Sequence, residues 1–283
     1  MPGKLLRFLP LAPAMAIFLC LYIAPMLLMF VYSFWSVEHF RMVPKWTLDN
    51  YVFFLTNTAY LRVFLRTVTT AAITTGLALL ISYPLAYYVS KVATRAKLFL
   101  VLFIIIPFWT SFVIRAYAWA TILGARGLVN GLLIGIGVID EPLQEILYSP
   151  VSVVIGLLCI YLPFMTLTIY ASLERLDNRL LEAAHDLYAS QLRVFLKVTL
   201  PLSMPGIVAG VIFVFIPILG EYVVPNLLGG VSGYFITNIL VNLFGQSGQW
   251  GQGSAIAFVM MLFIIAILLV FRRFTNYEEA FAR

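Results

Sequence analysis

Six long apolar stretches, separated by short polar segments, dominate the pattern of residues along this 283-residue chain. They cover residues 8–37, 67–90, 98–123, 151–173, 205–228 and 255–271. A helix needs about 20 residues to cross the hydrocarbon layer of a bilayer, and the stretches lack the alternation of apolar and polar positions that is typical of barrel strands. The pattern therefore predicts an all-α integral membrane protein with six transmembrane helices.

The composition excludes a soluble protein. Hydrophobic residues make up 63% of the chain and charged residues 11%, and the mean hydropathy is +1.01, whereas soluble domains carry about 25% charged residues. The connections leave no room for a separate soluble domain, so residues 1–283 are interpreted as one membrane domain. Because the apolar core of a signal peptide has about 7–15 residues, we expect the longer first stretch to be retained as a span.

The distribution of Lys and Arg predicts the orientation, because cytoplasmic loops carry an excess of positive charge. With the N-terminus inside, the inner segments hold twelve of the 18 Lys and Arg residues and the outer segments hold five, while Arg115 lies within the third span. Both termini are therefore predicted in the cytoplasm. The positive charge is interpreted as topology and contact with anionic lipid, because no basic stripe with interleaved aromatic residues indicates nucleic acid binding.

Residues 174–204 form the longest and most charged inner loop of this prediction. Small and apolar residues recur in it at helical spacing, at Leu180, Ala183, Ala184 and Leu187. Glu182 and Asp186 fall on the other face, so the segment is predicted to form a short amphipathic helix with a small-residue face that a partner can approach closely. The plainer alternative is that this helix lies at the lipid interface.

A second short helix is predicted directly after the first one. It begins at about Ser190, whose hydroxyl is placed to cap it, and it is expected to end before Leu200 and Pro201. The two helices are predicted to meet at a bend near Tyr188 and Ala189.

The stretch from Glu182 to Gly206 reads EAAHDLYASQLRVFLKVTLPLSMPG. It resembles the EAA loop of permease subunits of binding-protein-dependent ABC importers. The resemblance rests on Glu182, Ala183 and Ala184, a small-residue turn, Phe195 and Val198, and then Leu200, Pro201, Pro205 and Gly206. It implies the type I ABC importer permease fold in a bacterial inner membrane, and it implies that the loop is a coupling helix that docks into a groove of a cytoplasmic ATPase.

The resemblance also implies roles and partners. The ATPase-coupling residues are then Arg179, Glu182, Ala183, Ala184, Asp186, Leu187, Tyr188, Ala189 and Ser190. The implied partners are a dimer of ABC ATPase subunits, an extracytoplasmic solute-binding protein and a second permease subunit, identical or homologous, with a homologous heterodimer partner favoured by the family. The implied mechanism is alternating access, in which ATP closes the ATPase dimer and hydrolysis resets the permease.

Tyr188 departs from the family pattern, which usually has Gly six residues after the Glu. A bulky residue in the left-handed region of backbone conformation costs about 1 kcal/mol or more. Two alternatives follow from this departure. Either the bend uses ordinary backbone angles, or Tyr188 fills a pocket of the partner that a Gly would leave empty.

Further segments are similar to the spermidine/putrescine permeases, so a polyamine is the expected substrate. These segments are Thr47 to Tyr51, Tyr83 to Ala86, Pro107 to Ser111 with Arg115, Gly220 to Pro225, and Leu227 to Gly230. Permeases for opines and other organic amines share much of this pattern, so an importer of opines, amino-acid derivatives or another small solute is the alternative.

Two ionisable residues, Arg115 and Glu221, lie within predicted spans, and such residues are functional candidates because their desolvation is costly. Glu221 lies between Pro217 and Pro225, which are expected to break the fifth helix near it. The hypothetical path for an organic cation comprises Glu221, Tyr222, Asn226, Trp109, Arg115 and Tyr117, with aromatic faces for cation–π contacts. The structural alternative is a salt bridge between Arg115 and Glu221.

No cofactor or metal is predicted for this chain. The Gly-rich segments 229–233 and 245–248 lie in the predicted outer loop, and no GxxxxGK[ST] motif follows them, so ATP and Mg are assigned to the partner ATPase. The outer position suits either a mobile surface for a binding protein or a plain connector.

An ATP-independent secondary transporter or channel is the alternative from another class of function, although such a protein needs no ATPase-docking loop.

Overall fold

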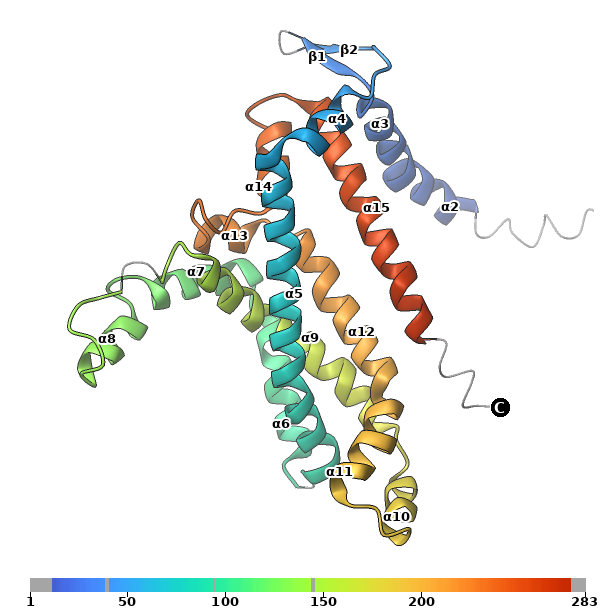
Figure 1. Ribbon diagram of the computed structural model, residues 1–283, viewed down its shortest axis with the longest axis vertical. Helices are drawn as coiled ribbons and strands as arrows, with labels where there is room; N and C mark the ends of the chain where they lie inside the picture. Colours follow the sequence, from blue (N-terminus) through green and yellow to red (C-terminus); the bar gives the residue numbers. More distant parts are fainter. Residues whose placement is uncertain (1–11, 39–40, 94, 144–145, 276–283) are drawn as a thin grey trace, which may run out of the picture. The chain divides into compact units, whose positions relative to one another are not determined.

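The computed structural model describes residues 12–38, 41–93, 95–143 and 146–275, and it is mostly helical (Figure 1). Six helical segments of this part are long and apolar enough to cross a membrane: Pro13–Tyr32, Thr58–Val92, Phe112–Gly135, Pro150–Glu174, Gln191–Leu219 and Trp250–Phe271. The predicted all-α class with six spans is confirmed. Residues 8–11 of the first predicted span, and Lys4, Arg7 and Arg283 of the charge count, lie outside the described residues.

The chain divides into two compact units, and the first comprises the described part of Met1–Arg62 together with Ile239–Phe263. Its first span is built from α2 (Ala12–Phe18), a π-helical turn (Leu19–Ile23) and α3 (Ala24–Tyr32). An antiparallel hairpin of β1 (Ser36–Glu38) and β2 (Arg41–Val43) follows, and then α4 (Asp49–Thr56).

Hydrogen bonds of one buried side chain hold the turn after α3 in this unit. The Asn50 amide donates to the carbonyls of Ser33 and Trp35, at 2.9 Å each. Gly251, near the start of α15 (Trp250–Thr275), lies against the same place, because a Cβ there would overlap the Trp35 carbonyl and the Asn50 amide. The absence of a side chain at this position therefore lets the last helix approach the turn closely.

The second unit comprises Val63–Asn238 and the described part of Ile264–Arg283. It contains most of α5 (Thr58–Tyr87), a π-helical turn (Tyr88–Val92), α6 (Lys97–Ile105), α7 (Phe112–Leu123), α8 (Leu128–Gly135) and α9 (Pro150–Glu174). The chain continues through α10 (Asn178–Asp186), α11 (Gln191–Val194), a π-helical turn (Phe195–Thr199), α12 (Leu200–Leu219), α13 (Val223–Leu228) and the start of α14 (Ile236–Phe244).

Helices α9 and α12 form the core of the second unit and run side by side (Figure 1). Two glycines of α12 allow the close contact, since a Cβ on Gly206 would overlap Ser172 and a Cβ on Gly210 would overlap Met165 and Thr168. Small residues at helix contacts are typical of membrane proteins, where association depends on van der Waals packing rather than on exclusion of water. The two helices therefore pack as one rigid pair.

The predicted third span, residues 98–123, is not a single helix. Helix α6 ends at Ile105, a 3₁₀ turn covers Ile106–Trp109, and Thr110 is extended with φ −99° and ψ 141° before α7 begins at Phe112. Pro107 explains the interruption, because it has no N–H to donate and its ring collides with the preceding helical turn. The span-length segment is instead Phe112–Gly135, which joins α7 and α8.

The predicted fifth span also has different ends. Continuous helix begins at Gln191 rather than at residue 205 and stops at Leu219, and α13 forms a separate short helix from Val223. The expected break near Glu221 is therefore present. The predicted end of the loop's second helix before Leu200 is wrong, because the chain stays helical through a π turn into α12.

Candidate functional site

The EAA loop, residues 174–204, contains the amphipathic helix that the sequence predicts, α10 (Asn178–Asp186). The carboxylate of Asp177 accepts a hydrogen bond of 2.9 Å from the backbone N–H of Arg179, which starts the helix. Most of the predicted coupling residues are exposed, namely Arg179, Glu182, Ala183, Asp186, Leu187, Tyr188 and Ser190, while Ala184 and Ala189 are partly buried. The loop therefore presents its side chains outward.

Large apolar side chains of this loop face outward together with the charged ones. The exposed fractions are 50% for Leu180, 81% for Leu187, 96% for Tyr188 and 67% for Leu192. An exposed group of apolar side chains is typical of a surface that another molecule covers. No other described part of the chain buries these four side chains as a hydrophobic core would.

Tyr188 adopts the left-handed backbone conformation, with φ +56°. It follows the end of α10, where the N–H of Ala189 donates to the carbonyl of Ala184 at 3.2 Å. This is the hydrogen bond of a helix C-terminus whose left-handed position is usually filled by Gly. The alternative of ordinary backbone angles at the bend is therefore wrong, and the chain keeps a strained, almost fully exposed tyrosine there.

The second half of the loop differs from its prediction in two respects. Ser190 stands at the start of α11 with an extended ψ of 154°, but its hydroxyl makes no capping hydrogen bond to any described residue. The helix then continues past Pro201, because the wider π turn Phe195–Thr199 directly before it leaves room for the proline ring. The loop is thus joined to α12 without a break.

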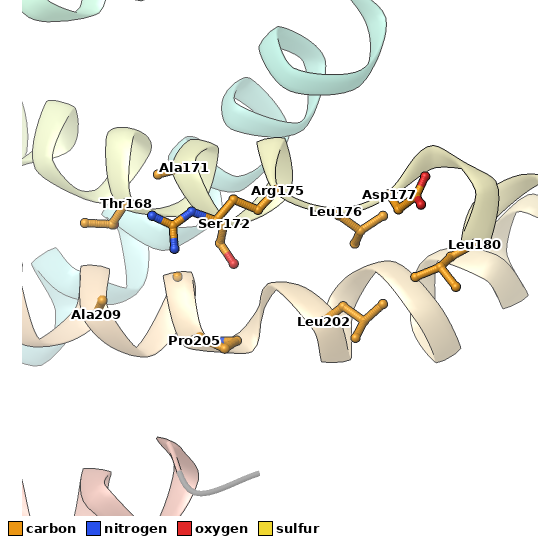
Figure 2. Close-up of a pocket in the computed structure, with 11 residues that line it drawn as sticks. Thr168, Ala171, Ser172, Arg175, Leu176, Asp177, Leu180, Leu202, Pro205 and Ala209 are labelled. Carbon is orange, nitrogen blue, oxygen red and sulfur yellow. The ribbon is translucent and has the colours of Figure 1, made fainter. Parts of the chain in front are cut away.

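A cavity of about 570 Å³ lies at the start of the loop, between α9, α10 and α12 (Figure 2). Ser172 and Arg175 line it from α9 and its end, Leu176 and Leu180 from the linker and α10, and Leu202 from α12. Figure 2 shows the Arg175 side chain reaching back along α9 past Ser172. The linker between α9 and α10 therefore borders open space on this side.

Glu221 lies in the break between α12 and α13 and is 8% exposed. Its carboxylate accepts hydrogen bonds from the Tyr161 hydroxyl and from the backbone N–H of Val223, both at 3.0 Å, and so caps the first turn of α13. Thr237 donates a short hydrogen bond to the Glu221 backbone carbonyl. The buried carboxylate is therefore held by α9 and α13, and the Glu221 backbone is held by α14.

Arg115 does not form the salt bridge with Glu221 that was the structural alternative. The only ion pair among the described residues joins Lys97 and Glu174. The Arg115 Nε is buried without a hydrogen-bond partner in the part of the chain that the structure describes. Helix α7, which carries Arg115, packs against α13 and α9, so its guanidinium lies in the same region as the break but is not paired with it.

The other predicted path residues are mostly exposed. Trp109 is 82% exposed and Tyr117 58% exposed, and Asn226 is also exposed. Tyr222 is partly buried, and its carbonyl accepts a hydrogen bond of 3.1 Å from the Asn238 amide. Their role in a substrate path stays a prediction.

Tyr161, Thr237 and Asn238 hold the break and were missed from the sequence. The side chain of Asn238 also accepts a 3.0 Å hydrogen bond from the N–H of Phe235, which caps α14. Of these contacts, only the cap by Asn238 could have been predicted from the sequence, because Asn238 lies three residues after Phe235, which precedes α14. The contact of Tyr161 with Glu221 joins residues 60 positions apart, so no local pattern indicates it.

The Gly-rich segment 229–233 forms a hydrogen-bonded turn, and its role as a binding-protein surface or as a plain connector stays a prediction. The N–H of Gly233 donates to the carbonyl of Gly229 at 2.7 Å, and the Arg66 guanidinium donates to the Val231 carbonyl at 3.1 Å. Gly230 has φ +53°, so a residue without Cβ suits this position. The turn presents the Val231 side chain, which is 92% exposed.

Comparison with known proteins gives concordant results. The family described as binding-protein-dependent transport system inner membrane component matches residues 5–279. The spermidine/putrescine transport system permease protein PotB of Haemophilus influenzae is 38% identical over 227 residues, which cover 80% of this chain and 79% of that protein. The inner membrane ABC transporter permease protein YdcU of Escherichia coli is 34% identical over 285 residues, covering 95% and 89%.

A solved structure shares the fold. A chain of the bacterial alginate ABC transporter in complex with an alginate pentasaccharide-bound periplasmic protein superposes with a TM-score of 0.74 at 18% identity, covering 97% of this chain and 94% of that one. The family match and the fold agree with the six apolar helices and the EAA loop. The chain therefore belongs to the family of binding-protein-dependent transport system inner membrane components, as a multi-pass permease subunit of a bacterial inner membrane ABC importer.

Proposed function

We propose that this permease subunit imports polyamines, with putrescine and spermidine as the substrates. The proposal is carried by the 38% identity to PotB across 80% of the chain. Polyamines are organic cations, and a path for them needs acceptors and aromatic faces rather than a cationic lining. The buried carboxylate of Glu221, at the helix break that follows the fifth span, supports the proposal as a counter-charge for such a cation.

The EAA loop is proposed to couple this import to ATP. In this proposal a dimer of ABC ATPase subunits binds ATP and Mg, and α10 with the bend at Tyr188 inserts into a groove of that ATPase. Leu180, Leu187 and Tyr188 are exposed apolar side chains, which supports contact of this surface with a protein partner rather than with water. The distribution of Lys and Arg along the sequence supports a position of this loop on the cytoplasmic side of the membrane.

The strained bend at Tyr188 favours the explanation that the Tyr188 side chain, in place of the usual Gly, fills a pocket of the partner. A left-handed tyrosine costs about 1–2 kcal/mol relative to glycine, and it is 96% exposed, so no contact within the chain repays this cost. Backbone strain that persists at a defined position is a reason to infer a functional constraint. We therefore include Tyr188 among the side chains that fill a pocket of the ATPase.

Two further partners complete the proposal. A second permease subunit, homologous to this one, supplies the other half of the pore, because six spans of one chain form only one side of a path between two such subunits. An extracytoplasmic solute-binding protein delivers the substrate, and the turn at 229–233 with its exposed Val231 is proposed as part of the surface it contacts. Alternating access then follows from ATP-driven movement of the EAA loop.

Uptake measurements test the proposal. Labelled putrescine and spermidine are supplied to cells with the chain, without it, and with the Glu182→Ala variant. We expect uptake to be lost both on deletion and in the variant, while the variant protein remains in the membrane at normal abundance. Polyamine uptake that is unchanged by deletion would overturn the polyamine substrate, and competition with opines and other organic amines would then identify the cargo class.

A further inference from the structure

The EAA loop is attached at its beginning to the end of α5. Lys91, in the π-helical turn Tyr88–Val92, donates a 2.9 Å hydrogen bond to the carbonyl of Leu176 and a 2.8 Å hydrogen bond to the side-chain oxygen of Asn178. Leu176 lies in the linker directly after α9, and Asn178 is the first residue of α10. One ammonium group therefore holds both sides of the linker on which α10 turns.

The same helix also contacts the end of the loop. The ring of Phe195 packs edge-to-face on Tyr83, with 5.6 Å between ring centroids, and on Tyr87 at 6.3 Å. The hydroxyl of Tyr83 lies 3.0 Å from the Ser203 hydroxyl, in the first turns of α12. Helix α5 and the turn after it thus contact both the beginning and the end of the EAA loop.

A second lysine nearby provides a contrast. Lys97, at the start of α6, pairs with Glu174 at 2.6 Å, and the two side chains are 30% and 42% exposed. Glu174 is the last residue of α9, so this pair does not reach α10. Exposed ion pairs contribute little because water screens them, whereas the Lys91 bonds include a carbonyl at the end of α9, where the helix dipole favours a cation.

The linker between α9 and α10 borders a cavity and is also bonded to the end of α5. On one side the 570 Å³ cavity borders Arg175, Leu176 and Leu180, so α10 is not packed against the α9 and α12 pair there. The Lys91 bonds join the linker to the end of α5. The tightly packed α9 and α12 resist relative displacement, so we expect a force on α10 to act on the Lys91 bonds and on the contacts of α10 with α11 and the π turn Phe195–Thr199.

We propose that helix α5 receives the movement of the EAA loop, and that Lys91 is the positioning residue that attaches α10 to it. The inference rests on the proposed coupling function of the loop and adds the route by which the movement leaves it. The π-helical turn around Lys91 fits this role, because such turns occur frequently at functional sites of helices. Lys91 touches neither substrate nor ATP in this proposal and acts through α10.

The test compares the same substitution at the two lysines. The transporter is purified with its co-purifying subunits, reconstituted in vesicles, and assayed for putrescine uptake and ATP hydrolysis in the same preparation. We expect Lys91→Met to lower the uptake per ATP hydrolysed about tenfold, with the ATPase still bound. Lys97→Met is expected to stay within about twofold of wild type, because its ion pair is exposed.

Two further variants keep the test informative if Lys91→Met assembles poorly. Lys91→Arg keeps the charge and the donors and is expected to recover most of the uptake per ATP, which a merely space-filling role would not require. Asn178→Ala removes one of the two Lys91 bonds at an exposed position, and we expect a loss between those of the two lysine variants.

The outcomes separate this inference from the proposed function. If wild-type protein retains an ATPase but Lys91→Met and Asn178→Ala transport with the wild-type ratio, the route through α5 is overturned while the coupling loop stands. An equal loss in Lys91→Met and Lys97→Met also overturns it, because the contact with α10 would then have no special role. If the wild-type chain retains no ATPase, the proposed function falls and this inference falls with it.

Discussion

The EAA loop and the helix break at Glu221 use their polar and apolar groups in opposite ways. At the break, the Glu221 carboxylate is buried and receives hydrogen bonds from Tyr161 and Val223 of the same chain. In the loop, Leu187 and Tyr188 remain exposed, and the backbone at Tyr188 is strained. The groups at the break are therefore paired within one subunit, whereas the loop leaves apolar side chains exposed, which we propose a partner covers.

This difference predicts where a substitution acts. A change at the break leaves buried groups unpaired and lowers the stability of the subunit itself. A change in the loop removes groups that water already solvates, so it leaves the subunit stable and acts on assembly or coupling. The following predictions are ordered by their expected effect on the stability of the isolated subunit.

Glu221→Ala is expected to have the largest effect. It removes the acceptor of the Tyr161 hydroxyl and of the Val223 N–H, and buried unsatisfied groups cost about 1–3 kcal/mol each. Thermal unfolding of the purified subunit in detergent should show a clearly lowered midpoint. A midpoint equal to that of wild type would contradict the view that the break is held from within.

Glu221→Gln is the matched variant, because it removes the negative charge and keeps one acceptor oxygen at the break, while an NH₂ donor replaces the other oxygen. We expect a smaller loss of stability than for alanine and a strong loss of putrescine uptake, since the cation loses its counter-charge. Normal uptake in this variant would reduce Glu221 to a structural cap and remove it from the substrate path.

Tyr161→Phe removes one hydrogen bond to the Glu221 carboxylate and leaves the ring in place. Hydrogen bonds within membrane proteins contribute about 0.6–1.7 kcal/mol, so we expect a loss near 1 kcal/mol, measured by the same unfolding assay. The double variant with Glu221→Ala should cost less than the sum of the two single variants, because both remove the same contact. Full additivity would argue against direct coupling of the two side chains.

Tyr188→Gly is expected to change stability in the opposite direction. Glycine adopts the left-handed conformation without the penalty of about 1 kcal/mol that tyrosine carries, so the isolated subunit should become slightly more stable. We expect the same variant to retain less ATPase on purification, because the exposed ring is lost. Tyr188→Phe is the control, and it should retain the ATPase if the ring rather than the hydroxyl fills the pocket.

Glu182→Ala should change stability least, because the side chain is exposed and no hydrogen bond joins it to another described residue. Substitutions at such positions usually lie within about 0.5 kcal/mol. Uptake is nevertheless expected to be lost, which would separate the function of the loop from its folding. A destabilised Glu182→Ala subunit would contradict the contrast between loop and break.

Much of the fold was accessible to sequence reasoning because the bilayer imposes a strong constraint. Each span requires about 20 apolar residues, and such runs identify six helices wherever polar segments separate them. The amphipathic helix α10 was also predicted, since its pattern repeats within two turns. The break near Glu221 followed from two prolines and a charge in one short segment.

The errors fell where helix continuity depends on how the chain adjusts to proline. Pro107 ends a helix within the predicted third span, whereas Pro201 lies within a helix that a preceding π turn allows to continue. Both are prolines in apolar surroundings, and the sequence offers no local rule that distinguishes them. The difference arises from the backbone hydrogen bonding of the neighbouring turns.

The sequence by itself determined the number of spans and the membrane class of the protein, because these depend on local hydrophobicity, and its resemblance to a known family placed the EAA loop. Only the tertiary structure decided which groups meet: Tyr161 with Glu221, Lys91 with the linker before α10, and Arg115 with no carboxylate among the described residues. These contacts join residues 60 or more positions apart. They depend on how helices pack against each other, which no periodicity within one helix specifies.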